Sequence, residues 1–324
     1  MRRLSDERVE LLDAILAESG HADLSAALLE KDEHLTDALR ALFDLRLEGM
    51  NLALCGGTSL AKAFEVIERM SEDVDLKVVL HDDAAALSRS RMRSRLRDLK
   101  SQVIAAVSEL GFTPDAGTSI ALNEHRYIHT RWAYTTRYGR AAGLRPHLQI
   151  ELVMRAPALP LERRQITSLA GRLSGEADSP PFDAWVVSPA ETMAEKVLSF
   201  LRRLALHRGG RMIAAWDQAL VRHIYDVHCL IRSDPALLAA AGRVFPLLVA
   251  QDAQEPGRRH PDFAAAPFKA LSLALTVAAD DAQTQQEYRD HLLPLIYGSY
   301  RPDFDEAFES FREVAVALLA TLER

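Results

Sequence analysis

The sequence has few of the features that mark several common protein classes. It contains only two cysteines, Cys55 and Cys229, in 324 residues. Two cysteines are too few for a disulfide framework or a thiolate zinc site, which fits a reducing compartment. No apolar run is long enough to span a bilayer, and the stretch MRRLSDERVELL lacks the apolar core of a signal peptide. We therefore expect a soluble, cytoplasmic protein with no membrane partner.

An excess of positive charge is also missing. The formal net charge is -7, which argues against a general nucleic-acid coat but leaves room for a local basic face. Hydrophobic residues make up 48% of the chain and charged residues 26%, as in ordinary globular proteins, so the composition argues against wholesale disorder. The length suggests two domains, each able to bury a core.

The hydrophobic pattern divides the chain into a mixed first part and a helical second part. Residues 1–50 and 82–110 have helical periodicity, and AKAFEVIERM is good helix material, whereas SEDVDLKVVL alternates with a period of two. The stretches EHRYIHTRWAYTTRYG, LRPHLQIELVM and FDAWVVS predict further strands. From Ser188 onward the chain predicts helices to its end, with Ser188 as N-cap, Pro189 at the first position and Glu191 closing a capping box.

A linker-like stretch, GEADSPPFD, lies between the two parts and places a boundary near residues 175 to 188. We expect an α+β fold, a mixed β-sheet core with flanking helices over residues 1–180. A helical C-terminal domain over residues 181–324 would complete the active-site cleft.

Two aspartates one residue apart lie on the predicted strand SEDVDLKVVL. Asp73 and Asp75 would point to one face while the aliphatic residues pack the other. In HLQIELV, Glu151 likewise projects from the face opposite the aliphatic residues. If this strand pairs beside residues 73–79, three carboxylates meet on one surface. Such an oxygen-rich site suits a hard divalent ion such as Mg²⁺, as in nucleotidyl transfer.

A glycine pair precedes these aspartates in the stretch CGGTSL. Gly56 and Gly57 allow backbone N–H groups to approach phosphate oxygens closely, and Thr58 and Ser59 add hydroxyl donors. A helix that begins at about Ser59 would aim its N-terminal dipole at a triphosphate. Cys55 is expected to be a small buried residue at the end of a strand.

Four ordered motifs over roughly residues 50 to 232 resemble the AbiEii/AbiGii and MenA-like nucleotidyltransferases, the toxins of bacterial toxin-antitoxin and abortive-infection, phage-defence pairs. The motifs are GGTSLAKAF with SEDVDL, then IEL, AEKVLSFLRR and RHIYDVHCL. The resemblance implies a nucleotidyltransferase-like fold and Mg²⁺ or Mn²⁺ as cofactor. It also implies an NTP donor and a cognate antitoxin as partner.

The resemblance carries over to particular residues. Gly56, Gly57, Thr58 and Ser59 match the phosphate-binding motif, Asp73 and Asp75 the metal-binding pair, and Glu151 the position of a third acidic ligand. Lys196 matches a lysine held against the nucleotide phosphates, and Asp226 the aspartate of the last motif, which would position the acceptor or orient Lys196. Arg69 matches an arginine ahead of the acidic pair, while Met70 stands where an aromatic residue is more usual.

Each of these residues also has a purely structural interpretation. Lys196 lies near a core-facing stripe and could cover it with its stem, and Asp226 could pair with Arg222 one turn earlier. His125, His129, His223 and His228 match no tight ligand spacing, and we interpret them as surface or core histidines.

Two basic stretches are candidates for contact with an RNA backbone. The first is RSRMRSRLRDLK, residues 89–100, for which a solvated helix face is the alternative. The second comprises Arg202, Arg203, Arg208 and Arg211.

The resemblance implies a toxin that transfers a nucleotide from an NTP to a cellular acceptor, foremost the tRNA 3' end, and so arrests growth. Two alternatives remain open from the sequence. The acceptor could be a protein hydroxyl or a small molecule of the aminoglycoside type, or the chain could be a non-catalytic nucleotide-binding scaffold.

Overall fold

The computed structural model describes the whole chain except residues 19–23, 140–142, 176–179, 211–215, 255–260 and 324. It divides into two compact units. The sheet unit comprises residues 1–157 and 161–187, and the helical unit comprises residues 158–160 and 188–324.

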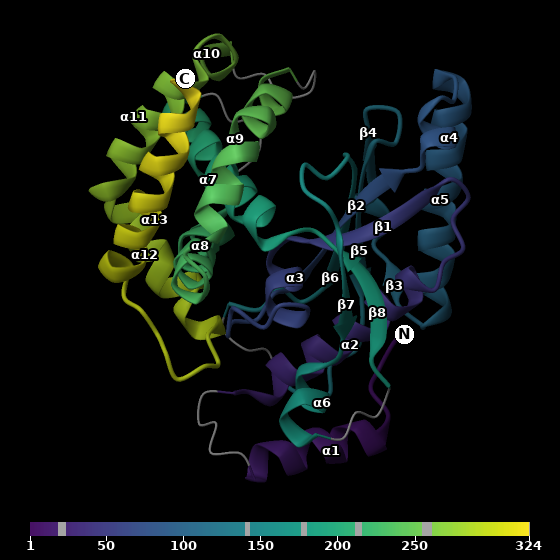
Figure 1. Cartoon of the computed structure of the whole chain (residues 1–324). Helices are drawn as coiled ribbons and strands as arrows, with labels where there is room; N and C mark the ends of the chain where they lie inside the picture. The colour runs from purple at the N-terminus through teal and green to yellow at the C-terminus, as the bar shows by residue number, and fades with distance from the viewer. Residues whose placement is uncertain (19–23, 140–142, 176–179, 211–215, 255–260, 324) are drawn as a thin grey trace. The chain divides into compact units, whose positions relative to one another are not determined.

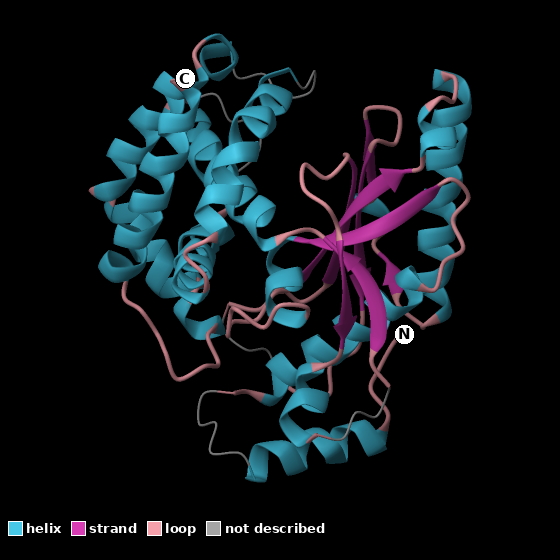
Figure 2. Cartoon of the chain, viewed as in Figure 1, coloured by secondary structure: helices cyan, strands magenta, loops and turns pink. Residues whose placement is uncertain are grey.

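One mixed β-sheet forms the centre of the sheet unit (Figure 2). Its strands are β1 (Met50–Cys55), β2 (Asp73–Leu80), β3 (Thr113–Pro114), β4 (Ile120–Leu122), β5 (Tyr127–Ala133), β6 (Leu148–Met154), β7 (Glu162–Ile166) and β8 (Phe182–Val186). The strand order is β3-β5-β6-β2-β1-β8-β7, with β4 paired to β5. Strand β2 runs parallel to β6 and antiparallel to β1, while β1 runs parallel to β8. The expected mixed sheet with flanking helices is confirmed.

The helices of the sheet unit are α1 (Asp6–Glu18), α2 (Ala26–Phe43), α3 (Gly56–Lys62), α4 (Asp82–Ala85), α5 (Arg89–Glu109) and α6 (Leu169–Ser174), with a 3₁₀ turn, η1 (Ala116–Thr118). Helix α5 forms because its apolar residues recur every three or four positions, as at Leu96, Leu99 and Val103, and these pack into the core together with Leu35 and Leu39 of α2. The core therefore lies on one face of the sheet.

Helices also make up nearly all of the helical unit (Figure 1). They are α7 (Pro189–Arg208), η2 (Gln218–Val221), α8 (Arg222–Ser233), α9 (Leu237–Gln254), α10 (Pro261–Ala265), α11 (Pro267–Ala279), α12 (Ala282–His291), η3 (Leu293–Leu295), α13 (Phe304–Leu319) and η4 (Ala320–Leu322). Helix α7 packs against α8, α9 and α11.

The start of α7 has the predicted N-cap and the predicted proline in its first turn. The Ser188 side chain accepts a hydrogen bond from the backbone N–H of Ala190, and Pro189 occupies the first turn. The Glu191 carboxylate accepts the N–H groups of Ala158 and Leu159, each at 2.8 Å, and so binds this short segment to the helical unit.

The prediction of a helix over AKAFEVIERM is wrong. Helix α3 ends at Lys62, and Glu65 adopts a left-handed φ of 55°, which a continuing helix does not allow. The following chain is non-helical and buries Ile67 and Met70. Tertiary burial of these side chains outweighs a helix propensity that is only a weak preference.

Candidate functional site

The glycine turn lies between β1 and β2 and begins α3 directly. The helix begins at Gly56, three residues before the predicted start at Ser59. Gly56 has a φ of 70°, and a Cβ at this position would overlap Oδ2 of Asp75 and lie 3.2 Å from the Asp75 Cβ. A Cβ on Gly57 would lie 2.7 Å from the Ser71 Oγ and 2.8 Å from Nη2 of Arg69. Both glycines therefore let the turn press against the residues around the acidic pair.

The two hydroxyls of the turn bond within the protein. Thr58 Oγ1 donates to the backbone oxygen of Asp73 and also lies 3.0 Å from Oγ of Ser71. Ser59 Oγ donates to the backbone oxygen of Gly56 at 2.8 Å. Both side chains are buried, so in this structure they stabilise the turn and link it to the start of β2.

The three predicted acidic ligands share one face of the sheet. Asp73 and Asp75 are half-buried, whereas Val74 and Leu76 between and beside them are buried in the core. Asp75 is the register partner of Glu151 on β6 and of Cys55 on β1. The pairing of the two predicted strands is thus confirmed. Cys55 lies at a strand end as expected, although it is only half-buried.

The carboxylates of this face turn to separate protein partners. Arg145 Nη1 lies 2.7 Å from Oδ1 and 2.6 Å from Oδ2 of Asp73. The Tyr127 hydroxyl donates to Oε2 of Glu151 at 2.9 Å. Within the described part of the chain, no group of three or more His, Cys, Asp or Glu side chains lies close enough to hold a metal ion. The oxygen donors suit Mg²⁺ or Mn²⁺ chemically, and the contact with Arg145 would compete with coordination by Asp73.

Buried charges support this edge of the sheet. Glu72 accepts the backbone N–H of Arg145, and Lys31 on α2 donates to the backbone oxygens of Arg145, at 3.0 Å, and His147. Glu72 and Lys31 are both almost completely buried. Sequence reasoning missed Arg145, Lys31 and Glu72. The stretch EKDEH at positions 30–34 held a signal, because five successive polar residues in an amphipathic helix cannot all face solvent.

A second buried ion pair joins α2 to α3. Lys62 Nζ lies 2.7 Å from Oδ1 of Asp32 and 2.7 Å from the Thr36 hydroxyl. Burial lowers the pKa of Lys62, while the nearby Asp32 carboxylate opposes this shift. Burial also raises the pKa of the neighbouring Glu33. These bonds hold the helix that begins at the glycine turn against the core helix α2.

The helical unit brings its two predicted site residues together. Lys196 Nζ on α7 lies 2.7 Å from Oδ2 of Asp226 on α8, and their side chains are 7% and 0% exposed. His223 Nδ1 lies 3.2 Å from the backbone oxygen of Lys196. Burial, and then the Lys196 cation, lowers the pKa of His223 well below its ordinary value. The His223 ring is therefore neutral at pH 7.

A family model described as nucleotidyl transferase AbiEii toxin, type IV TA system, matches residues 37–310. The chain belongs to this family. It is also similar to the solved structure of MenT4, nucleotidyltransferase toxin Rv2826c from Mycobacterium tuberculosis H37Rv. That match has 21% identity and a TM-score of 0.35, and it covers 98% of this chain and 99% of that chain. No curated protein matches the chain.

As an AbiEii toxin, the chain belongs to a family of nucleotidyl transferases that work in toxin-antitoxin pairs, which implies a cognate antitoxin. None of the described helices is both long enough and apolar enough to cross a membrane.

The two basic stretches of this AbiEii chain differ in exposure. In α5 the arginines at 89, 91, 93 and 97 are exposed while Met92 and Leu96 are buried, so these arginines are accessible from solvent. Arg202 is buried, and its Nε lies 2.8 Å from Oδ2 of Asp252. Arg202 is therefore not part of an exposed basic patch. Arg211 lies outside the described residues.

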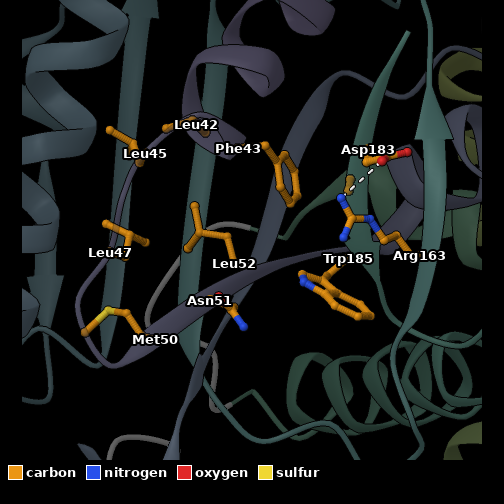
Figure 3. A pocket seen from close by; sticks show the side chains of 11 residues that line it. Leu42, Phe43, Leu45, Leu47, Met50, Asn51, Leu52, Arg163, Asp183 and Trp185 are labelled. Carbon is orange, nitrogen blue, oxygen red and sulfur yellow. Dashed lines mark hydrogen bonds and ion pairs between the residues drawn. The ribbon is translucent and has the colours of Figure 1, made fainter.

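A hollow of about 200 Å³ opens at the other end of β1 from the glycine turn (Figure 3). The hollow lies where β1 and β8 separate. These two strands pair only at Ala53↔Trp185 and Leu54↔Val186. Phe43 and Leu52 form part of an apolar wall, while Asn51 and the ion pair between Arg163 and Asp183 supply polar groups. None of the predicted site residues lines this hollow.

Proposed function

We propose that this AbiEii toxin transfers a nucleotide from an NTP to a cellular RNA, with the tRNA 3' end as the foremost acceptor, and thereby arrests growth. The observation that carries the proposal is the close contact of Gly56 with Asp75, whose register partner is Glu151. A glycine turn for phosphates thus lies directly against the carboxylates that such a transfer requires.

Asp73, Asp75 and Glu151 would hold Mg²⁺ or Mn²⁺ on the polar face of the sheet. A bound ion of this kind neutralises charge on the reacting phosphates and lowers the pKa of the attacking hydroxyl. The first amides of a helix have no partners within it, so the backbone of Gly56, Gly57 and Thr58 would bind phosphate oxygens. Thr58 and Ser59 would contribute chiefly by shaping this turn, since their hydroxyls bond within the protein.

Lys196 would place its ammonium against the triphosphate, and Asp226 would keep it oriented through the 2.7 Å ion pair. The exposed arginines of α5 would contact the RNA backbone, and a cognate antitoxin would restrain the activity in the cell.

The proposal is tested by incubating the purified protein with total bacterial RNA, Mg²⁺ and each α-³²P-labelled NTP in turn. We expect label on RNA of tRNA size. Asp75→Ala should reduce this labelling by about 100-fold or more, the scale seen when a group that stabilises the transition state is removed. Asp183→Ala is the matched control, because Asp183 is an exposed aspartate of the same sheet and should leave labelling unchanged.

The alternatives correspond to other outcomes of the same experiment. Label that appears on protein, or on an added aminoglycoside, and not on RNA would exclude the RNA acceptor and keep nucleotidyl transfer. Growth arrest on expression that persists in Asp75→Ala, with no transfer to any acceptor, would indicate a non-catalytic scaffold and contradict the proposal.

A further inference from the structure

The loop before β6 carries an arginine whose side chain is aimed at the acidic pair. A single nitrogen of Arg145, Nη1, contacts both carboxylate oxygens of Asp73, at 2.7 and 2.6 Å. The two side chains are 26% and 22% exposed, so this ion pair meets solvent. The pair is part-buried, so water and small ligands can reach it.

The backbone of Arg145 is held much more firmly than its side chain. Glu72 accepts its N–H, and Lys31 donates to its carbonyl oxygen at 3.0 Å. Charged groups are costly to bury unless they are bonded, and here two buried charges act on one residue of a loop. The main chain thus keeps Arg145 within reach of Asp73.

This contact competes with the chemistry proposed for Asp73. The Arg145 cation neutralises the Asp73 carboxylate and occupies a lone pair on each of its oxygens, so it weakens the attraction of this carboxylate for a divalent cation. The carbonyl oxygen of Asp73 also accepts a hydrogen bond from Thr58 of the glycine turn. Asp73 therefore contacts both Arg145 and the turn. The planar guanidinium fork that binds a carboxylate binds a phosphate equally well.

We propose that Arg145 is a positioning residue that exchanges partners during nucleotide binding. Without nucleotide it neutralises Asp73. When an NTP and its divalent cation bind, Arg145 releases Asp73 to the cation and binds a phosphate oxygen of the NTP. Because of this exchange, a positive charge always lies beside the acidic face. Binding of the cation and binding of the nucleotide therefore depend on each other. This inference rests on the proposed nucleotidyl transfer.

Two binding titrations on the full chain test the exchange without relying on activity. The first follows Mn²⁺ alone by electron paramagnetic resonance, and the second follows α,β-methylene analogues of the four NTPs with Mg²⁺ by calorimetry. The variants are Arg145→Ala and Arg145→Lys. Arg163→Ala is the control, because Arg163 is an arginine of the same unit that pairs with a different aspartate, Asp183, at 3.1 Å.

Removing the guanidinium should affect the two ligands in opposite directions. We expect Arg145→Ala to bind Mn²⁺ about tenfold more tightly than the unsubstituted protein and the analogue about tenfold more weakly, the scale of one charge-assisted contact. Arg145→Lys keeps the charge but loses the fork, so it should be intermediate for both ligands. Arg163→Ala should match the unsubstituted protein.

An unchanged or weaker affinity of Arg145→Ala for Mn²⁺ would overturn the exchange, as would an unchanged affinity for the analogue. If the unsubstituted protein still labelled RNA, the proposed function would stand in either case. Failure of the unsubstituted protein to bind analogue and to transfer any nucleotide would instead overturn the proposed function, and the role of Arg145 with it.

Discussion

Each unit of this toxin holds an aspartate of the predicted site in an ion pair, and the two pairs differ in burial. In the sheet unit, Asp73 meets Arg145 where both side chains are about a quarter exposed. In the helical unit, Asp226 meets Lys196 with the aspartate completely buried. Solvent reaches both members of the first pair, whereas in the second only a small part of Lys196 is exposed.

The difference indicates that the two units hold their ion pairs in different ways. Breaking a buried pair by removing one partner costs about 3–5 kcal/mol, because the remaining charge stays in a poorly solvating environment. Surface pairs contribute about 0–1 kcal/mol, and the part-buried pair of Asp73 with Arg145 lies closer to that range than the Asp226 pair does. The helical unit thus holds the Lys196 side chain in one position. In the sheet unit the partners of Asp73 can change, and the close packing of Gly56 against Asp75 fixes the shape of the turn.

The largest effect that tests this comparison is expected for Asp226→Ala. It should lower the free energy of unfolding by about 3–5 kcal/mol, because Lys196 stays buried without this partner. Arg145→Ala should lower it by about 1 kcal/mol at most. Urea denaturation monitored by circular dichroism measures both.

A double variant separates stability from function in this pair. Lys196→Met combined with Asp226→Leu should recover most of the stability lost in Asp226→Ala, since apolar residues of similar size replace buried ion pairs well. RNA labelling should remain abolished. Similar losses of stability in Asp226→Ala and Arg145→Ala would contradict the contrast between the two pairs.

A smaller effect on stability, with a large effect on function, is expected for Gly56→Ala. Gly175 provides the matched control, because its φ of 71° equals that of Gly56 within a degree and nothing lies within 4 Å of a Cβ built there. Gly175→Ala should cost about 1–2 kcal/mol, the penalty of a left-handed backbone alone. Gly56→Ala should cost about 1–3 kcal/mol more, the scale of overpacking, because its Cβ overlaps Asp75.

Thermal melting and RNA labelling of the two glycine variants test this expectation together. Gly175→Ala should keep its transfer activity, whereas Gly56→Ala should lose it. Equal behaviour of the two variants would show that the contact with Asp75 does not shape the site.

The smallest effect is a pH dependence in the helical unit. The pKa of His223 is lowered by burial and by Lys196, so the unfolded chain takes up a proton near pH 6.5 while the folded chain does not. Stability from this residue is therefore lost as the pH falls below about 6.5, by up to about 1.4 kcal/mol per pH unit. In His223→Gln, urea denaturation between pH 7 and pH 5 should show a shallower loss. The exposed His81→Gln is the control, and an equal loss in both variants would exclude this role for His223.

Much of the fold was predictable because its signals are local. Alternation with a period of two located β2 and β6, and Ser188 with Pro189 marked the start of α7. The sequence did not predict that the strands of Asp75 and Glu151 are neighbours. It predicted only that the two residues would share a face if the strands paired, as they do. The end of α3 was not predictable, because the burial of Ile67 and Met70 outweighed local helix propensity.

The sequence by itself determined the residue types of the candidate site and their order along the chain. The glycine pair, the aspartates one residue apart and the later lysine and aspartate are patterns that need no partner to be recognised. Only the tertiary structure decided which charges meet, because ion pairs such as Asp73 with Arg145 and Lys196 with Asp226 join residues 72 and 30 positions apart. Such contacts depend on how strands and helices pack, and no local pattern of side chains records them.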